Sequence, residues 1–188
     1  MTRRTQTTHA SYGAAAVLLA ATALTGCGVE QASEGLDLVS SSQSLAGCTT
    51  GELELSLGEP QGAAGSTVYD LIFTNIGEEA CALQGFPGVS YVTGPDGSQI
   101  GRAAERSGST GGSVSLDPEG QASARIRAVD VENYPSDVCD PMEVAGFRVY
   151  PPNDYDSLYV ANSATACANV NSDAHQLDVT TIVPGVQE

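Results

Sequence analysis

The sequence contains no lysine, and positive charge of any kind is scarce in it. Its seven basic residues are all Arg and stand against 23 Asp and Glu, so the formal net charge is −16 at pH 7. Nucleic acids and anionic lipid headgroups are bound through clustered Lys and Arg, so we expect neither to be recognised. The absence of Lys also excludes P-loop NTPases, Schiff-base enzymes and pyridoxal-phosphate enzymes. After position 27 the one remaining His is His175, which excludes an H-E-x-x-H zinc site.

We expect residues 1–26 to be a lipoprotein signal peptide. Arg3 and Arg4 supply a basic start, and the mostly apolar segment 13–24 is shorter than the roughly 20 residues of a membrane-spanning helix. The next residues, Leu24-Thr25-Gly26-Cys27, resemble the lipobox of bacterial lipoproteins. The resemblance implies a diacylglycerol on the Cys27 sulfur and cleavage before Cys27, and two acyl chains anchor a protein stably. An ordinary cleaved signal with Cys27 left as a thiol is the alternative, and the export route, general or twin-arginine, stays open.

The chain after the signal divides into a tether, a domain and a short tail. Residues 27–46 are polar, rich in Ser and without aromatic residues, which predicts a lipidated cysteine followed by a flexible tether. Residues 47–184 carry the strand signals of one domain, and residues 185–188 form a tail. We therefore expect the domain to lie at the extracytoplasmic face of the cell membrane. The membrane is its expected partner, bound through the lipid anchor.

An even number of cysteines follows Cys27, which in an exported chain predicts disulfides rather than a metal site: Cys48, Cys81, Cys139 and Cys167. Residues 52–57 alternate polar and Leu side chains, and residues 67–74 are rich in β-branched and aromatic residues, so both read as strands. If they pair antiparallel, Cys48 before the first and Cys81 after the second end on the same side of the hairpin.

The same arrangement recurs later in the chain. Residues 146–150 and 157–160 are predicted strands, with Cys139 before them and Cys167 after them. We therefore predict the bridges Cys48–Cys81 and Cys139–Cys167. Each is expected to contribute roughly 3.5 kcal/mol by restricting the unfolded chain.

Further strand signals fill the rest of the domain: residues 89–92 and 99–101 around a Pro-Asp-Gly turn, residues 113–116 and 121–129 across a second tight turn at 117–120, and a last alternating run at 176–182. No window after Cys27 shows a sustained helical period. These short strands with frequent turns predict an all-β fold, an antiparallel immunoglobulin-like β-sandwich with two disulfides.

One motif carries a family resemblance. The run Cys81-Ala82-Leu83-Gln84-Gly85-Phe86-Pro87-Gly88-Val89, with Leu71-Ile72-Phe73-Thr74-Asn75 before it and Arg148-Val149-Tyr150-Pro151-Pro152 after it, resembles a family of exported actinobacterial proteins known as domain of unknown function 4232. The resemblance covers roughly residues 47–183. It implies a secreted β-sandwich, often behind a lipobox, with no established activity and no catalytic residues to transfer. From the residues themselves, Gly85 suits a positive φ or a close approach of the backbone, and we expect Phe86 to fill the core rather than to contact a ligand.

The sequence offers little support for a catalytic site or a metal site. His175 would have to serve any Ser-His-Asp triad, but no G-x-S-x-G motif presents a nucleophile, so we expect a surface His. Asp137, Asp140, Asp154 and Asp156 offer oxygen ligands for Ca²⁺, yet no Asp-x-Asp-x-Asp-Gly loop is present. We therefore predict no catalytic residue, no metal and no cofactor.

The candidate ligand-binding residues lie in the stretch 150–159, where aromatic and polar side chains gather in an expected hairpin loop: Tyr150, Asn153, Asp154, Tyr155, Asp156 and Tyr159. Such amphipathic aromatics often recognise sugars or peptides. In the alternative interpretation, Tyr150 and Tyr159 point into the core and Pro151-Pro152 merely ends a strand.

These observations favour a lipid-anchored, non-catalytic module, monomeric, that binds or supports a protein or glycan of the cell envelope. One alternative is an envelope hydrolase with carboxylates such as Asp137 or Asp154 in acid and base roles. Another is a lipoprotein that captures a solute for a transporter, which needs a concave pocket. The ligand and the biological process are not encoded in any motif we find.

Overall fold

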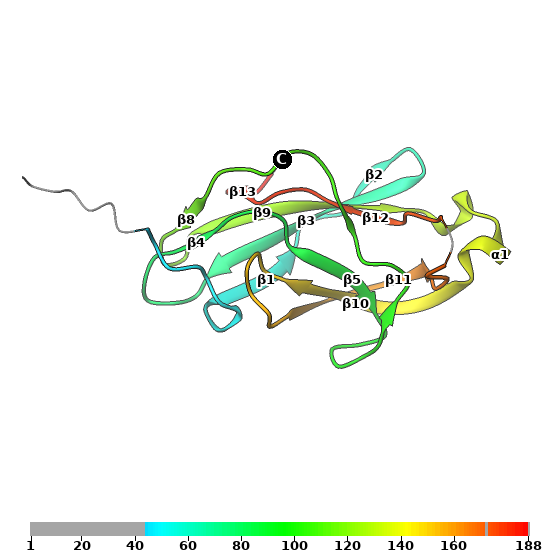
Figure 1. The fold of residues 1–188 in the computed structure, drawn as a ribbon, viewed down its shortest axis with the longest axis horizontal. Helices are drawn as coiled ribbons and strands as arrows, with labels where there is room; N and C mark the ends of the chain where they lie inside the picture. Colours follow the sequence, from blue (N-terminus) through cyan, green and yellow to red (C-terminus); the bar gives the residue numbers. More distant parts are fainter. Residues whose placement is uncertain (1–43, 172, 188) are drawn as a thin grey trace, which may run out of the picture. The chain divides into compact units, whose positions relative to one another are not determined.

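A computed structural model describes residues 44–171 and 173–187, and the regular secondary structure in this part of the chain is almost entirely β-strand (Figure 1). The predicted signal peptide at 1–26, the predicted lipidation site Cys27 and most of the predicted tether at 27–46 lie outside the described residues. The strands are β1 (Leu53–Leu57), β2 (Gln61–Ala63), β3 (Ser66–Asn75), β4 (Cys81–Leu83), β5 (Gly88–Val92), β6 (Gln99–Ile100), β7 (Glu105–Arg106), β8 (Val114–Leu116), β9 (Gln121–Val129), β10 (Pro141–Tyr150), β11 (Leu158–Cys167), β12 (Leu177–Val179) and β13 (Val183–Pro184). Three short helices join them: η1 (Thr50–Glu52), η2 (Val131–Asn133) and α1 (Ser136–Cys139).

The larger sheet has the strand order β1-β3-β9-β12-β7, with β2 paired to β3 and β13 paired to β9. The predicted hairpin between residues 52–57 and 67–74 is confirmed, because β1 pairs antiparallel with β3 and Leu55 lies opposite Phe73. The expectation of purely antiparallel pairing is wrong at one edge, where β12 runs parallel to β7. The expected single strand at 176–182 is also wrong, because the chain leaves β12 at Thr180 and resumes as β13.

Charged side chains pair across the outer face of this sheet. The Asp70 carboxylate is only 5% exposed and accepts a hydrogen bond of 2.9 Å from the Arg125 guanidinium on the neighbouring strand. Arg127 and Asp178 form a looser ion pair of 3.6 Å between more exposed side chains. Pairing with Arg125 offsets part of the cost of burying the Asp70 charge.

The smaller sheet has the order β11-β10-β5-β6. The predicted hairpins of β10 with β11 and of β5 with β6 are confirmed as antiparallel pairs. The register of β10 and β11 shifts between Val144 and Gly146. A Cβ at Gly146 would lie 2.2 Å from the Val160 carbonyl oxygen and 2.9 Å from the Tyr159 ring, so the two strands approach closely at a position that only glycine fits.

The pairing expected between residues 113–116 and 121–129 is wrong. The turn at 117–120 does form, but β8 pairs with β4 in a separate two-stranded sheet while β9 pairs with β3 and β12. The fully buried Asn75 holds the strands apart at this turn. Its side-chain amide donates to the Leu116 carbonyl, and its backbone N–H donates to the Gly120 carbonyl, so the chain passes from one sheet to another within the turn.

One hydrophobic core receives side chains from both main sheets. Leu71 and Phe73 of β3 are completely buried in it, as are Phe147 and Val149 of β10. The Phe147 ring stacks on Tyr91 of its own sheet, with ring centroids 4.8 Å apart, and meets Tyr69 of the larger sheet edge-on at 5.9 Å. Aromatic contacts of this geometry contribute beyond the area they bury.

Both predicted disulfides are present. The bridge Cys48–Cys81 ties the segment before β1 to β4, and both cysteines belong to the main core. The bridge Cys139–Cys167 ties the end of α1 to the end of β11, in a smaller buried cluster. The two bridges close sequence separations of 33 and 28 residues.

Candidate functional site

The candidate site is a hollow of about 320 Å³, formed where the segment after β4 meets the loop between β10 and β11. Segments far apart in the sequence supply its walls. The side chains that line it are Gln84, Phe86, Arg106, Thr110, Pro152 and Asn153. The structure therefore joins one predicted ligand-binding residue, Asn153, to the motif that carried the family resemblance.

The backbone at Gly85 forms one wall of this hollow. Gly85 has φ 103°, which confirms the predicted positive φ and is strained for residues with a Cβ. Its carbonyl accepts hydrogen bonds from the Ile182 N–H at 2.9 Å and from the Thr181 hydroxyl at 3.0 Å. The same hydroxyl accepts from the Gly111 N–H at 3.1 Å, which fixes the chain beside Thr110. The segment after β12 therefore holds two walls of the hollow in place.

Phe86 does not fill the core, so that expectation is wrong. Its side chain is half-buried and lines the hollow, while Pro87 is buried in its place. Because side chains alternate in extended backbone, the inward Pro87 and Val89 leave Phe86 outward. The guanidinium carbon of the exposed Arg106 lies 5.8 Å from the centre of the Phe86 ring, within the range of a cation–π contact. The sequence analysis did not identify Arg106 as a site residue. The only feature that could have pointed to it is that basic residues are scarce in this chain.

The two outer tyrosines of the stretch 150–159 also lie outside the core, so the alternative that placed them there is wrong. Tyr150 is 37% exposed and packs beside Gly88 on the outer face of β10. Tyr159 is half-buried, and its hydroxyl donates to the Ala145 carbonyl at 2.9 Å. Tyr155, by contrast, is 96% exposed at the tip of the loop. Of the three, Tyr155 is the one whose ring is free to contact another molecule.

Asp154 holds the loop together. Its Oδ1 accepts from the N–H groups of Tyr155 and Asp156 at 2.7 and 3.1 Å, and its Oδ2 accepts from the Thr50 N–H at 2.7 Å. These bonds, led by those from the Asp156 and Thr50 backbone, hold the pKa of Asp154 below its ordinary value. Asn153 takes a left-handed φ of 66°, and its amide donates to the Gln84 carbonyl at 3.4 Å. The loop is therefore stiffened by its own polar residues.

The four carboxylates considered for Ca²⁺ fall into two separate places. Asp154 and Asp156 follow the last residue of β10, whereas Asp137 and Asp140 precede its first residue. A strand of ten residues spans about 30 Å, so the two pairs do not share a site. Within residues 44–171 and 173–187 no group of three or more His, Cys, Asp or Glu side chains is placed to hold a metal.

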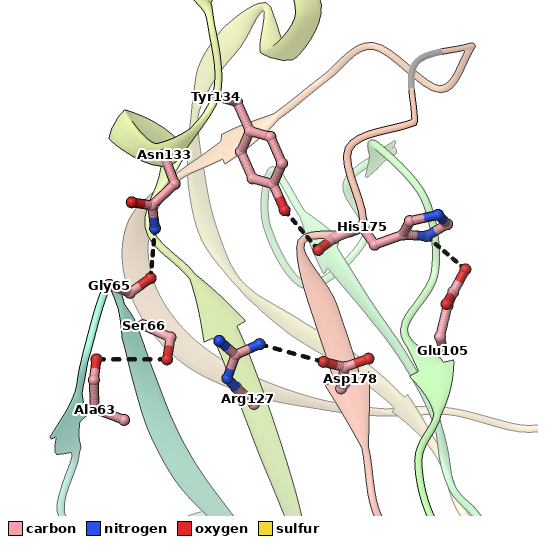
Figure 2. Close-up of polar contacts among 9 residues, drawn as sticks. All are labelled: Ala63, Gly65, Ser66, Glu105, Arg127, Asn133, Tyr134, His175 and Asp178. Carbon is pink, nitrogen blue, oxygen red and sulfur yellow. Dashed lines mark hydrogen bonds and ion pairs between the residues drawn. The ribbon is translucent and has the colours of Figure 1, made fainter.

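His175 lies on the surface, as expected. Its side chain is 47% exposed, and its Nδ1 contacts the Glu105 carboxylate (Figure 2). Its backbone carbonyl accepts a hydrogen bond of 2.8 Å from the Tyr134 hydroxyl. These contacts tie β7, the segment before β12 and the segment after η2 to one another.

Residues 48–183 match the family described as Domain of unknown function (DUF4232), and the chain therefore belongs to this family. No curated protein matches the chain. None of the helices in the described part of the chain is long and apolar enough to cross a membrane.

Proposed function

We propose that this member of the DUF4232 family is a lipid-anchored, non-catalytic module on the outer side of a cell membrane, which binds a polar ligand of the cell envelope in the hollow beside Phe86. The first part of the proposal is supported by the N-terminal sequence, where basic, apolar and small-residue segments precede Cys27. The second part is supported by the hollow itself.

We also infer that the domain is an immunoglobulin-like sandwich. The sharing of one core by two multi-stranded sheets supports this, as does the chain's passage from β8 to β9 between different sheets. A crystal structure with the two main sheets face to face would agree with the inference. A closed barrel would contradict it.

The composition of the hollow carries the functional proposal. Phe86 supplies an apolar ring face, Gln84 and Asn153 supply amides, Thr110 supplies a hydroxyl, and Arg106 is its one charged side chain. A few polar groups around an aromatic surface orient and select a small ligand. The lining has one cation and no carboxylate, so in spite of the chain's net charge of −16 the local charge favours a glycan unit that bears an acidic group.

Asp154 is poorly suited to one role that the hydrolase alternative gives it, that of the general acid. Its two oxygens accept three backbone hydrogen bonds, and its lowered pKa keeps it ionised at neutral pH. A general acid must carry a proton near the working pH, and a carboxylate fixed in this way is poorly suited to that role.

Lipidation is tested by mass spectrometry of the membrane fraction. The wild-type chain should begin at Cys27 and carry acyl chains, and Cys27→Ser should release the protein from the membrane. An uncleaved chain, or a Cys27 without lipid, would contradict the anchor.

Ligand binding is tested by NMR titration of the isotope-labelled Cys27→Ser chain with glucuronate and with glucose. We expect saturable shifts that centre on Phe86 and Asn153, with glucuronate binding more tightly. Arg106→Gln should remove the preference for glucuronate, and Arg102→Gln, an exposed Arg that does not line the hollow, should keep it.

Two further variants test the Phe86 wall of the hollow and the tip of the neighbouring loop. Phe86→Ala, with the fold checked by circular dichroism, should abolish the shifts, and Tyr155→Ala should weaken binding if the loop tip reaches the ligand. Unchanged binding in Phe86→Ala would overturn the proposed site.

A further inference from the structure

A second hollow, of about 190 Å³, lies between the two main sheets at the end that η2 covers. Tyr69 of β3 and Tyr91 of β5 reach it from opposite sheets, and Thr165 of β11 adds a hydroxyl. Asp130 and Glu132, both exposed, lie at its rim. Its volume is below that of a typical drug-sized pocket, so it suits a small molecule.

The two phenols inside this hollow lack hydrogen-bond partners. Tyr91 is only 3% exposed, and among the described residues no hydrogen bond reaches its hydroxyl or that of Tyr69. Neither oxygen is fully enclosed by the protein, so both hydroxyls face the open hollow, where solvent or a ligand can form the hydrogen bonds that the protein does not supply. Burial, with Tyr69 and Asp130 nearby, raises the pKa of Tyr91, so its hydroxyl stays protonated and neutral at physiological pH.

The backbone segment that carries the two rim carboxylates is held on both sides, and Figure 2 shows the Asn133 and Tyr134 contacts that do so. The Asn133 side chain donates to the Gly65 carbonyl at 2.6 Å, and the Asp130 N–H donates to the same carbonyl at 3.0 Å. The Tyr134 hydroxyl is bound to the His175 carbonyl on the other side. The segment 130–134 is thus fixed to the turn between β2 and β3 and to the segment before β12, which reduces the ordering cost when a ligand binds.

Neither rim carboxylate is neutralised by the protein. Within the described residues, no Arg or His forms an ion pair with Asp130 or Glu132. The whole chain carries a net charge of −16, and clefts lined by charge of one sign concentrate ions of the opposite sign. Both effects favour a cation at this place.

We propose that this hollow binds a small organic cation with an ammonium group and a hydroxyl. The ammonium pairs with Asp130 and Glu132 at the rim, and the ligand's hydroxyl bonds to the oxygens of Tyr69 and Tyr91 inside. This site is separate from the hollow beside Phe86, with which it shares no lining residue.

The test is an NMR titration of the isotope-labelled Cys27→Ser chain with ethanolamine at constant ionic strength. Ethylene glycol, which has no charge, is the matched control ligand, and sodium and magnesium chloride control for screening. We expect saturable shifts around Tyr91, Asp130 and Thr165 with ethanolamine alone. Shifts that are not saturable, or that magnesium reproduces at the same residues, would overturn the proposal.

Variants separate the site from the general negative charge. Asp130→Asn/Glu132→Gln should weaken ethanolamine binding at least about tenfold, which is the scale of a lost charged hydrogen bond. Asp117→Asn/Glu119→Gln removes the same charge from an exposed turn and should leave binding unchanged.

A third variant, Tyr91→Phe, keeps the ring stacked on Phe147 and removes only the hydroxyl, and it should weaken binding several-fold. If the two double variants lose the same fraction of their affinity for ethanolamine, binding depends on net charge alone and the proposal is wrong.

Discussion

Removal of the Cys139–Cys167 bridge is a quantitative test of how this domain is stabilised. The change is Cys139→Ala/Cys167→Ala in the Cys27→Ser chain, so that Cys48 and Cys81 are the remaining cysteines. Ala avoids a polar atom at two positions that are 0% and 5% exposed.

The expected loss follows from the length of the closed loop. A separation of 28 residues corresponds to about 12 cal/mol/K of chain entropy, or about 3.6 kcal/mol at 25 °C. Loss of two buried sulfur atoms from the small cluster adds about 1 kcal/mol. The sum is a large share of the roughly 5–15 kcal/mol that a domain of this kind has in total.

The companion variant Cys48→Ala/Cys81→Ala separates entropy from packing. Its separation of 33 residues gives nearly the same entropy, about 3.7 kcal/mol. Its cysteines lie in the main core, however, where neighbours are packed more fully and a cavity costs more. We therefore expect it to be the less stable of the two variants by about 1 kcal/mol.

Urea unfolding followed by tyrosine fluorescence measures both values. The free energy of unfolding should fall by about 4–5 kcal/mol in Cys139→Ala/Cys167→Ala and by about 5–6 kcal/mol in Cys48→Ala/Cys81→Ala. The urea dependence should steepen in both because the unfolded chain expands without the crosslink. A loss below about 1.5 kcal/mol for Cys139→Ala/Cys167→Ala would refute the reasoning, since it would mean that the crosslink barely restricts the unfolded state.

Three further tests address local features of the fold, and two of them include a matched control variant. Gly146→Ala should destabilise the domain by about 2–3 kcal/mol, because its Cβ meets the neighbouring strand, while Gly62→Ala, where a Cβ meets nothing within 4 Å, should change urea stability by less than about 0.5 kcal/mol. Asp70→Ala leaves a partly buried guanidinium unpaired and should cost about 2 kcal/mol, against less than about 1 kcal/mol for Asp178→Ala, whose side chain is less buried than that of Asp70; equal losses would contradict this. The pKa of Asp154 lies below its ordinary 3.8, so its carboxylate stabilises the fold above that value and loses this contribution as pH falls through the folded-state pKa. The urea midpoint should therefore drop less in Asp154→Asn than in the wild type between about pH 6 and about pH 3, and identical drops would contradict the assignment.

Local patterns were sufficient for much of the fold. The period-two run at 52–57 and the β-branched and aromatic residues of 67–74 predicted β1 and β3 and their pairing, and the positions of the cysteines around the hairpins predicted both disulfides. Gly85 was recognisable for the same reason, since a positive φ is a property of a single residue. These features depend on neighbours in sequence or on the ends of one hairpin.

Only the tertiary structure shows which strands pair when they are far apart in the sequence. The turn at 117–120 reverses the backbone, but a turn does not specify which sheet the next strand joins, and here Asn75 sends β8 and β9 to different sheets. The face on which Phe86 lies depends on the φ of Gly85 and on the burial of Pro87, which alternation in sequence does not reveal. Both hollows are likewise built from strands far apart in sequence, because burial of a shared core, rather than any local propensity, brings those strands together.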